Sequence, residues 1–445
     1  MDVKTPLQQI LFWFRSSLTI RIIGIGILAL LLLIPSFMVS NLIQEREQTR
    51  NAAEEEVTSK WGGYQTIGGP IVSVPFYDSI KNERGESDRI LRYAHFLPED
   101  LQITGTVKPE KRYRGIYIVP LYQAELKISG SFSALDKHSL PISNRDLLWS
   151  DAFLSLGISD VKGIREKISI QLGGDTKEMG PGTRTNDVFV SGVNVKHSWD
   201  PSRSKTFSLK LSFNGSKELY FLPMAKETKV NIDSPWQTPS FEGDFLPDFR
   251  DITSSGFKAN WKVLELNRNY PQDFIGDAES GQVNGYRFGV RFLLPVDEYH
   301  KTIRSSKYSE LFLLLTFITY FFIEVYKKVR LHFIQYLLLG FAVLLFYIML
   351  LSLTEHIPFN VSYWIASSLI LALVTLYSRA FFKGEAVFLV AGGTIFAFYL
   401  FFFTLLQLED FALLVGTFGL FILLAIAMYF TRRIQELESN KDSQS

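Results

Sequence analysis

Apolar residues in this chain form two blocks separated by a long water-compatible stretch. The first block, Ile22–Val39, carries no charged residue, and a bilayer-spanning helix needs roughly 20 mainly apolar residues. From Leu311 to Thr431 the chain meets that requirement repeatedly, interrupted by short polar segments. The pattern predicts six membrane-spanning helices, one before the polar stretch and five after it. The predicted spans are Ile22–Val39, Glu310–Val325, Phe333–Leu353, Ser362–Tyr377, Ala386–Leu406 and Phe411–Phe430.

The spans divide the chain into five predicted segments. They are a cytoplasmic N-terminus (1–21), a first transmembrane helix (22–43), an extramembrane domain with a juxtamembrane helix (44–304), a five-helix transmembrane bundle (305–431) and a cytoplasmic tail (432–445). After the first span, Leu42, Ala53 and Val57 keep a helical spacing of apolar positions. No clear small-x-small cleavage site follows the span. Both observations favour an anchor that continues as a helix over a cleaved signal peptide.

The positions of lysine and arginine predict the orientation, because these residues collect in short cytoplasmic loops. Positive residues precede the first span, separate the second from the third and the fourth from the fifth, and follow the sixth. The intervening loops, Thr354–Val361 and Gln407–Asp410, contain neither lysine nor arginine. We therefore expect a multi-pass protein of the bacterial inner (cytoplasmic) membrane, with both termini in the cytoplasm and residues 44–304 in the periplasm.

The extramembrane domain is predicted to be mainly β. Short segments of alternating apolar and polar residues, separated by Gly, Pro, Asn and Asp, are typical of an antiparallel sandwich or a barrel-like assembly. One helix is predicted at Asn144–Leu156, with Ser143 as its N-cap. The predicted strands are Thr66–Phe76, Arg112–Ser131, Lys167–Leu172, Val188–Val195, Thr206–Phe213, Leu219–Leu222, Gly256–Leu266 and Tyr286–Leu294.

Composition and motifs predict no catalytic, cofactor or metal site. The formal net charge of +1 gives no indication of a nucleic-acid partner. The absence of cysteine excludes disulfides, a thiol nucleophile and thiolate metal ligands. The chain contains no GxSxG, HExxH or GxxxxGK[ST] motif, and its six histidines are scattered. Asp160 is interpreted as a turn residue whose carboxylate binds the backbone rather than as a catalytic acid. We therefore expect a protein that is not an enzyme.

Polar residues within the apolar blocks are candidates for function, because a charge in hydrocarbon costs several kcal/mol. Glu324 lies near the cytoplasmic end of the second span, about one turn before Lys327, and Arg379 follows the fourth span. An ion pair between helix ends is favoured over a proton or substrate relay, since the spans offer no second acid at greater depth. Gly392 and Gly393 indicate either a broken helix, as in transporters, or close helix packing. Close packing is the simpler interpretation.

Several segments resemble the CreD family of inner-membrane proteins, which are described as cell-envelope integrity proteins. The matching segments include Trp61-Gly62, Gly69-Pro70-Ile71-Val72-Ser73-Val74-Pro75, Glu110-Lys111-Arg112-Tyr113-Arg114-Gly115-Ile116-Tyr117, Gly215-Ser216-Lys217-Glu218-Leu219, Asn267-Arg268-Asn269-Tyr270-Pro271, Pro295-Val296-Asp297, Arg304-Ser305-Ser306-Lys307-Tyr308, Leu315-Thr316-Phe317, Leu408-Glu409-Asp410-Phe411-Ala412-Leu413-Leu414 and Met428-Tyr429-Phe430-Thr431-Arg432-Arg433. The combination spans almost the whole chain and is specific. The resemblance implies the same topology and a role in envelope maintenance or stress response, and it brings no enzymatic reaction.

The favoured function is that of a non-enzymatic envelope factor. In this hypothesis the periplasmic β domain binds a lipid, glycan or protein partner, and helices connect both of its ends to the bilayer. Arg304, Lys307 and Tyr308 lie near the second connection, where cations and a phenol are expected to meet lipid head groups. Whether the β domain binds a lipid, a glycan or a protein, membrane lipids are thus expected partners of this chain.

The alternative is that the six-helix bundle itself moves a lipid or a small solute. Five consecutive spans exceed what an anchor needs, which favours this alternative. The polar groups to test are then Glu324 with Arg379, and Glu409 with Asp410 at the outer face. A sensor that signals to a cytoplasmic partner is disfavoured, because the cytoplasmic loops are short.

Overall fold

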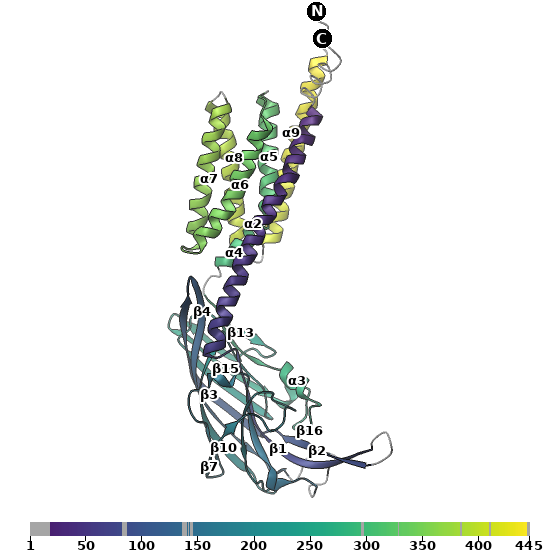
Figure 1. Ribbon diagram of the computed structural model, residues 1–445, viewed down its shortest axis with the longest axis vertical. Helices are drawn as coiled ribbons and strands as arrows, with labels where there is room; N and C mark the ends of the chain where they lie inside the picture. Colours follow the sequence, from purple (N-terminus) through teal and green to yellow (C-terminus); the bar gives the residue numbers. More distant parts are fainter. Residues whose placement is uncertain are drawn as a thin grey trace, which may run out of the picture. The chain divides into compact units, whose positions relative to one another are not determined.

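The computed structural model describes residues 18–442, except 82–86, 136–139, 141, 143–145, 295–297, 328, 383–384 and 409–410. The chain separates into two compact units. One unit, here called the β unit, comprises Arg50–Pro295. The other, here called the helical unit, comprises the residues up to Thr49 together with those from Val296 onward. Figure 1 labels the elements of both units.

The described residues include six helices that are long and apolar enough to cross a membrane. Their number and order, one before and five after the β unit, confirm the predicted pattern. The first helix is continuous over 44 residues, so the helical spacing seen beyond Val39 does mark an extension of the first span. The six helices are α2 (Leu18–Trp61), α5 (Ser309–Lys327), α6 (Phe333–Thr354), α7 (Phe359–Phe381), α8 (Glu385–Gln407) and α9 (Ala412–Asp442), and a short helix, α4 (Glu298–Ser306), precedes α5.

Aromatic side chains fill the interior of the helical unit. The Phe312 ring of α5 lies 4.6 Å from the Tyr399 ring of α8, centroid to centroid. Phe346 of α6 lies 4.9 Å from Tyr399 and 5.3 Å from Tyr363 of α7. All four side chains are almost fully buried. Edge-to-face and tilted pairs at these separations add to the burial of apolar surface, so α5–α8 share one core.

Glycines allow two pairs of helices to approach closely. A Cβ atom added at Gly340 of α6 would lie 2.3 Å from Leu32 Cδ1 of α2, and one added at Gly392 of α8 would lie 2.7 Å from Thr375 Oγ1 of α7. Helix α8 runs without interruption through Gly392 and Gly393. The glycine pair therefore does not mark a broken helix. Gly392 supports close packing, as small residues do in membrane helices, whereas a side chain at Gly393 would meet open space.

The β unit contains two mixed sheets. The first has the order β13-β17-β11-β1-β5-β9-β8, with β2 paired to β1 and β16 paired to β2. Its strands are β13 (Pro239–Gly243), β17 (Phe288–Phe292), β11 (Glu218–Phe221), β1 (Gln65–Lys81), β5 (Phe153–Ile158), β9 (Gly192–Lys196), β8 (Gly180–Pro181), β2 (Ser87–Phe96) and β16 (Asp273–Ile275).

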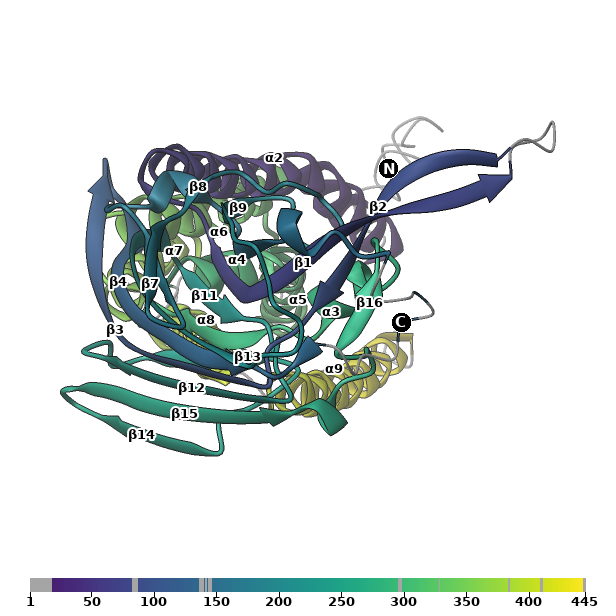
Figure 2. The ribbon, with the colours of Figure 1, turned by 90° about the horizontal axis from the view of Figure 1, so that it is seen from below.

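The second sheet has the order β14-β15-β12-β3-β4-β10-β6-β7. Figure 2 shows β14, β15, β12 and β3 side by side. Its strands are β14 (Phe249–Thr253), β15 (Gly256–Leu264), β12 (Glu227–Ser234), β3 (Asp100–Arg114), β4 (Tyr117–Phe132), β10 (Lys205–Ser216), β6 (Ser169–Leu172) and β7 (Asp175–Glu178). Among the residues that the structure describes, the unit also contains the short helical segments η2 (Trp149–Asp151), η3 (Val161–Gly163), η4 (Glu265–Asn267) and α3 (Ser280–Gly285).

Most strand pairs are antiparallel, as predicted, but two central pairs are parallel. β1 pairs with β11 in parallel, with Ile67 opposite Phe221. β3 pairs with β12 in parallel, with Ile103 opposite Val230. Parallel neighbours need long crossover connections. The turn residues between consecutive segments of the sequence do not reveal which distant strands such a connection brings together. The mainly β architecture is therefore confirmed, with mixed sheets in place of purely antiparallel ones.

A single apolar core joins the inward faces of the two sheets. β10 shows how the sequence builds it, since Phe207, Leu209, Leu211 and Phe213 are buried while the residues between them are at least partly exposed. Successive side chains of a strand point to opposite faces, so this alternation places one face in the core and the other in solvent.

The helix predicted at Asn144–Leu156 is wrong. Within its described residues, the chain forms the single 3-10 turn η2 and then enters β5, all of whose residues are buried. β5 lies between β1 and β9 and is buried on both faces, so it carries no charged residue and only one polar side chain, Ser155. Periodicity cannot distinguish such a run from a buried helix.

The last three turns of α2 belong to the β unit and are bound to it by ion pairs. The buried carboxylate of Glu54 pairs with the ammonium group of Lys217, and Glu56 pairs with Arg114 at 3.0 Å. The Trp61 indole N–H donates to the Tyr122 carbonyl at 3.4 Å. These contacts explain why the helix continues beyond any span length, since its polar end packs on folded structure.

A loop between β8 and β9 packs one aromatic ring against glycines of the first sheet. The Phe189 side chain is 7% exposed. A Cβ atom added at Gly157 of β5 would lie 2.4 Å from Phe189 Cδ1, and one added at Gly68 of β1 would lie 2.7 Å from Phe189 Cε1. Only a residue without a side chain fits beneath the ring at these two positions.

Candidate functional site

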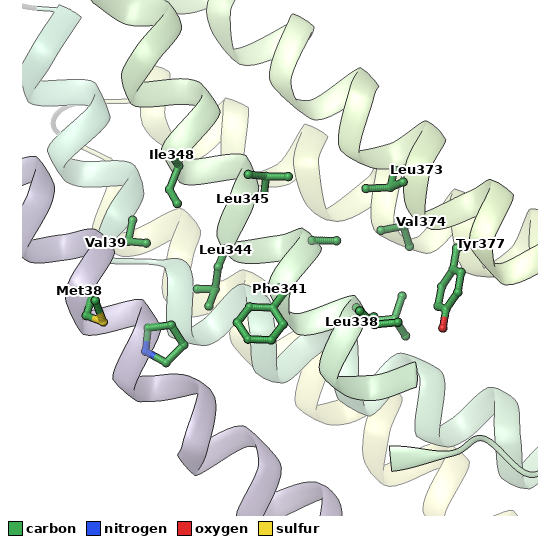
Figure 3. Close-up of a pocket in the computed structure, with 13 residues that line it drawn as sticks. Met38, Val39, Leu338, Phe341, Leu344, Leu345, Ile348, Leu373, Val374 and Tyr377 are labelled. Carbon is green, nitrogen blue, oxygen red and sulfur yellow. The ribbon is translucent and has the colours of Figure 1, made fainter. Parts of the chain in front are cut away.

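The helical unit contains an apolar groove bounded by three helices. Its volume is about 590 Å³, which lies within the range of about 300–1,000 Å³ typical of small-molecule sites. Figure 3 shows side chains of α2, α6 and α7 around it. The lining residues are Pro35, Met38, Val39, Leu338, Leu339, Phe341, Ala342, Leu344, Leu345, Ile348, Leu373, Val374 and Tyr377.

The floor of the groove is one face of α6. Leu338, Phe341, Leu345 and Ile348 are spaced by three and four residues, so they lie in a line along the helix. Each of these side chains is 39–48% exposed. The line covers ten residue steps, about 15 Å at 1.5 Å per residue. That length is about half of the roughly 30 Å hydrocarbon core of a bilayer.

The groove also reaches below the surface of the helices. Val39, Leu339, Ala342, Leu344 and Val374 line it, although each is less than a tenth exposed. A molecule in the groove would therefore contact three helices at once, which a molecule on the convex face of a single helix cannot do.

Close packing of α2 on α6 positions one wall. Leu32 of α2 is 1% exposed and lies over Gly340, three residues before the wall begins at Pro35. Proline inside a helix removes one backbone hydrogen bond, here the one to the Leu31 carbonyl. The other wall is α7, whose Tyr377 carries the hydroxyl group seen at the end of the groove farthest from Met38 (Figure 3).

An ion pair around the buried carboxylate of Glu324 joins α5 to two of the groove's helices, α2 and α6. The Arg21 guanidinium of α2 donates to the Glu324 carboxylate of α5, and the Tyr336 hydroxyl of α6 donates to the other carboxylate oxygen at 2.9 Å. Glu324 is 4% exposed. A buried carboxylate needs such partners, so this cluster fixes α2 against α5 and α6.

The predicted site residues are not gathered in one place. Glu324 pairs with Arg21, whereas the Arg379 guanidinium lies 5.8 Å from the centre of the Phe388 ring. Arg304 donates to the Leu408 carbonyl at 2.8 Å, satisfying an acceptor just beyond the end of α8.

Two neighbours of Arg304 differ in their surroundings. Lys307 is exposed, and the Tyr308 ring lies 5.7 Å from that of Phe402. The head-group contact expected of Lys307 and Tyr308 stays a prediction. Glu409 and Asp410 lie outside the described residues.

Asp160 performs the structural role expected of it. Its carboxylate accepts hydrogen bonds from the backbone N–H of Lys162 at 3.0 Å and of Gly63 at 2.8 Å. It caps the N-terminus of the short turn η3 and links that turn to the start of β1. The interpretation as a turn residue is confirmed.

The β unit contains a serine, a histidine and an aspartate in series, which no sequence motif marks. Ser73 Oγ lies 2.8 Å from His95 Nδ1, and His95 Nε2 lies 3.0 Å from Asp187 Oδ2. The hydrogen bond from His95 lowers the pKa of the Asp187 carboxyl. Strand register alone brings the first two together, since Ser73 is directly opposite His95.

This series lacks the access that nucleophilic catalysis requires. A catalytic serine must reach the carbonyl carbon of its substrate, but Ser73 and His95 have no exposed surface. We therefore interpret the hydrogen bonds as structural, connecting β1 and β2 to the loop that carries Asp187 and Phe189. Among the residues that the structure describes, no group of three His, Asp or Glu side chains is placed to hold a metal ion.

Comparison with known proteins identifies the family. A family described as "Inner membrane protein CreD" matches residues 17–436. The chain belongs to the CreD family. The inner membrane protein CreD of Escherichia coli (strain K12) is 31% identical over 441 residues, which cover 96% of this chain and 94% of that protein. Family membership makes this chain an inner-membrane protein, and the CreD description names no enzymatic reaction.

One solved structure is similar only at a low level. It is the crystal structure of a candidate nutrient binding protein from Legionella pneumophila, with a TM-score of 0.20 and 8% identity over 48% of this CreD-family chain and 82% of that protein. A TM-score of this size supports no argument about fold or function.

Proposed function

We propose that this CreD-family protein binds one acyl chain of a membrane phospholipid in the groove between α2, α6 and α7. The observation that carries the proposal is the groove itself: about 590 Å³, lined by apolar side chains and one phenol. Its floor is about 15 Å long, the depth that the acyl chains of one leaflet occupy in a core of about 30 Å. Lipid is the apolar molecule available at this depth.

The proposal gives α5, α6 and α7 a purpose beyond anchoring. An anchor needs one or two spans, whereas the groove needs α6 and α7 in register with α2, and the α5 carboxylate of Glu324 pairs with Arg21 of α2. Lipid binding by the helical unit is one requirement of the alternative hypothesis, in which the six-helix bundle moves a lipid or a small solute. The space between the sheets of the β unit is occupied by core side chains, which favours surface contacts for that unit.

The orientation and the envelope role are part of the proposal. The alternation of positive loops supports termini in the cytoplasm and a periplasmic β unit. In that orientation Tyr377, four residues before the end of α7, lies toward the cytoplasmic leaflet, where its hydroxyl group can face the ester region of a lipid. A lipid-binding helical unit joined to a periplasmic β unit is consistent with a role in maintaining the cell envelope.

Photocrosslinking tests the acyl-chain site. The purified protein is reconstituted into nanodiscs containing a phospholipid with a diazirine in its acyl chain, irradiated and mapped by mass spectrometry. We expect severalfold more crosslinks on Leu338, Phe341 and Leu345 than on Leu413 and Phe421 of α9, which are at least as exposed. An even distribution over all exposed apolar side chains would show that the groove has no preference for lipid.

A groove-filling variant provides the control. Ala342→Phe places a ring in the groove, whereas Ala397→Phe makes the same change at an exposed position of α8 outside it. We expect Ala342→Phe to abolish the excess of crosslinks on α6 and Ala397→Phe to preserve it. Phe341→Ala changes the same part of α6 but widens the groove, so it should retain crosslinks on Leu338 and Leu345. Crosslinks retained in Phe341→Ala and lost in Ala342→Phe would indicate a loss of binding rather than a loss of folding.

A further inference from the structure

The outward face of the second sheet carries a row of residues that face one another across six adjacent strands. The register pairs Lys210 with Lys127, Lys127 with Thr104, Thr104 with Asn231, Asn231 with Asn260, and Asn260 with Phe249. Here called the lysine–amide row, it consists of Lys210 (β10), Lys127 (β4), Thr104 (β3), Asn231 (β12), Asn260 (β15) and Phe249 (β14). Every member is at least partly exposed. Five steps of about 4.8 Å give it a length of about 24 Å.

The two lysines form an uncompensated pair. Lys127 and Lys210 are directly opposite one another, and like charges in that position are destabilising. Among the described residues, no carboxylate within 4 Å is paired with either ammonium group, whereas Lys229 and Lys262 nearby share Glu227.

The need to guard a sheet edge does not explain these lysines. Lysine often protects edge strands, but β4 and β10 each have a neighbour on both sides. The carboxylates on this face, such as Glu125 and Asp233, lie in the next row. A row that keeps two adjacent positive charges and no negative one is suited to an anionic ligand.

The remaining side chains indicate a sugar polymer. Amides and a hydroxyl group (Asn231, Asn260, Thr104) can both donate to and accept from hydroxyl groups, and the Phe249 ring, 56% exposed, offers a flat apolar surface at the end of the row. A protein partner is disfavoured, because protein interfaces are depleted in lysine and rich in aromatic and apolar anchors. A lipid surface is disfavoured as well, since no large apolar side chain stands between the lysines and the amides.

We propose that the lysine–amide row binds an acidic glycan strand, with carboxylates of the glycan at Lys127 and Lys210 and its hydroxyl groups along Thr104, Asn231 and Asn260. The inference rests on the proposed periplasmic placement of the β unit, where envelope glycans are present. It is independent of the acyl-chain groove, which involves other residues in the other unit.

Binding is measured with the full-length protein in nanodiscs of phosphatidylcholine, which carries no net charge. The probe is a set of hyaluronan oligosaccharides, which bear a carboxylate on every second sugar; dextran is the neutral glycan and polyglutamate the carboxylate polymer without sugar. We expect saturable binding of hyaluronan that is at least about tenfold tighter than that of dextran or polyglutamate, a difference of about 1.4 kcal/mol.

The double variant Lys127→Glu/Lys210→Glu should weaken hyaluronan binding by at least about tenfold, because two attractions become repulsions. The matched control Lys162→Glu/Lys167→Glu changes the net charge equally at two exposed positions outside the row and should leave binding unchanged. Equal loss in both double variants, no hyaluronan binding at all, or equally tight binding of polyglutamate or dextran would each overturn the proposal. These results do not depend on orientation or on lipid, so they fail separately from the proposed function.

Discussion

Replacing Phe189 with alanine tests how the β8–β9 loop is attached to the first sheet. The ring is almost completely buried and is supported by Gly68 and Gly157, neither of which can extend to fill the space left behind. A buried Phe→Ala change costs about 3–5 kcal/mol when the site cannot collapse. For a domain of 150–250 residues, each kcal/mol lowers the Tm by about 2–4 °C, so the expected decrease for Phe189→Ala is about 6–20 °C.

The reciprocal change should depend on the ring. In the native protein, a methyl group at Gly157 would lie 2.4 Å from Phe189 Cδ1, and overpacking of this kind costs about 1–3 kcal/mol. With Phe189→Ala already present, the methyl group enters vacant space, and Gly157→Ala should cost nothing or stabilise slightly, because alanine loses less conformational entropy than glycine. The double-mutant cycle should therefore give a coupling of about 1–3 kcal/mol.

Thermal unfolding of the full-length protein in nanodiscs, followed by tryptophan emission, measures all four variants of the cycle. The buried indoles of Trp199 and Trp261 report on the β unit. A matched control is Val190→Ala in the same loop, whose side chain is 84% exposed and should shift the Tm little. Strictly additive effects of Phe189→Ala and Gly157→Ala would refute the reasoning, because they would show that the ring does not lie on Gly157.

Three further predictions concern other contacts. Because the hydrogen bond from His95 lowers the pKa of Asp187, the carboxylate contributes stability that is present above its unfolded pKa of about 3.9 and is lost as the pH falls through its lower folded value. Asp187→Asn should therefore flatten the acidic end of a Tm-against-pH curve, and an unchanged curve would contradict this account. Arg21→Ala leaves the Glu324 carboxylate without its cation and should lower the free energy of unfolding by about 3–5 kcal/mol, as breaking a buried pair does. The double variant Arg21→Ala/Glu324→Gln should recover most of that loss in thermal unfolding monitored by circular dichroism. No recovery would argue against an ion pair. Since the chain has no cysteine, Lys327→Cys can be labelled directly with a membrane-impermeant maleimide, and the proposed orientation predicts labelling only after the inner membrane is permeabilised.

The sequence predicts long or strictly alternating elements and misses those that depend on distant neighbours. The spans were predictable because each is apolar over a length that no soluble helix needs. β10 was predictable because four apolar residues alternate with polar ones. β12 was missed because its outward positions carry Glu227, Lys229 and Asp233, which left only two large apolar residues, Val230 and Ile232, to reveal the period.

The candidate site was less accessible to prediction than the fold. Leu338, Phe341 and Ile348 are indistinguishable in sequence from the other apolar residues of a span, and only the approach of α2 and α7 makes them the floor of a groove. The partner of Glu324 was likewise hidden, because Arg21 lies 303 residues away in the chain. Such contacts follow from tertiary packing, which local periodicity does not encode.

The two parallel strand pairs constrain the order of events during synthesis. β1 cannot pair with β11 until the chain has been made as far as Phe221, and β3 cannot pair with β12 until it has been made as far as Ser234. Ile67 precedes its partner Phe221 by about 150 residues, which at about 5–20 residues per second takes on the order of 10–30 s. Throughout that interval the edges of β1 and β3 lack these partners, and unpaired edges invite association with other chains. A newly made molecule thus depends on its surroundings to shield these strands, and slower translation between Asp100 and Ser234 would lengthen that dependence.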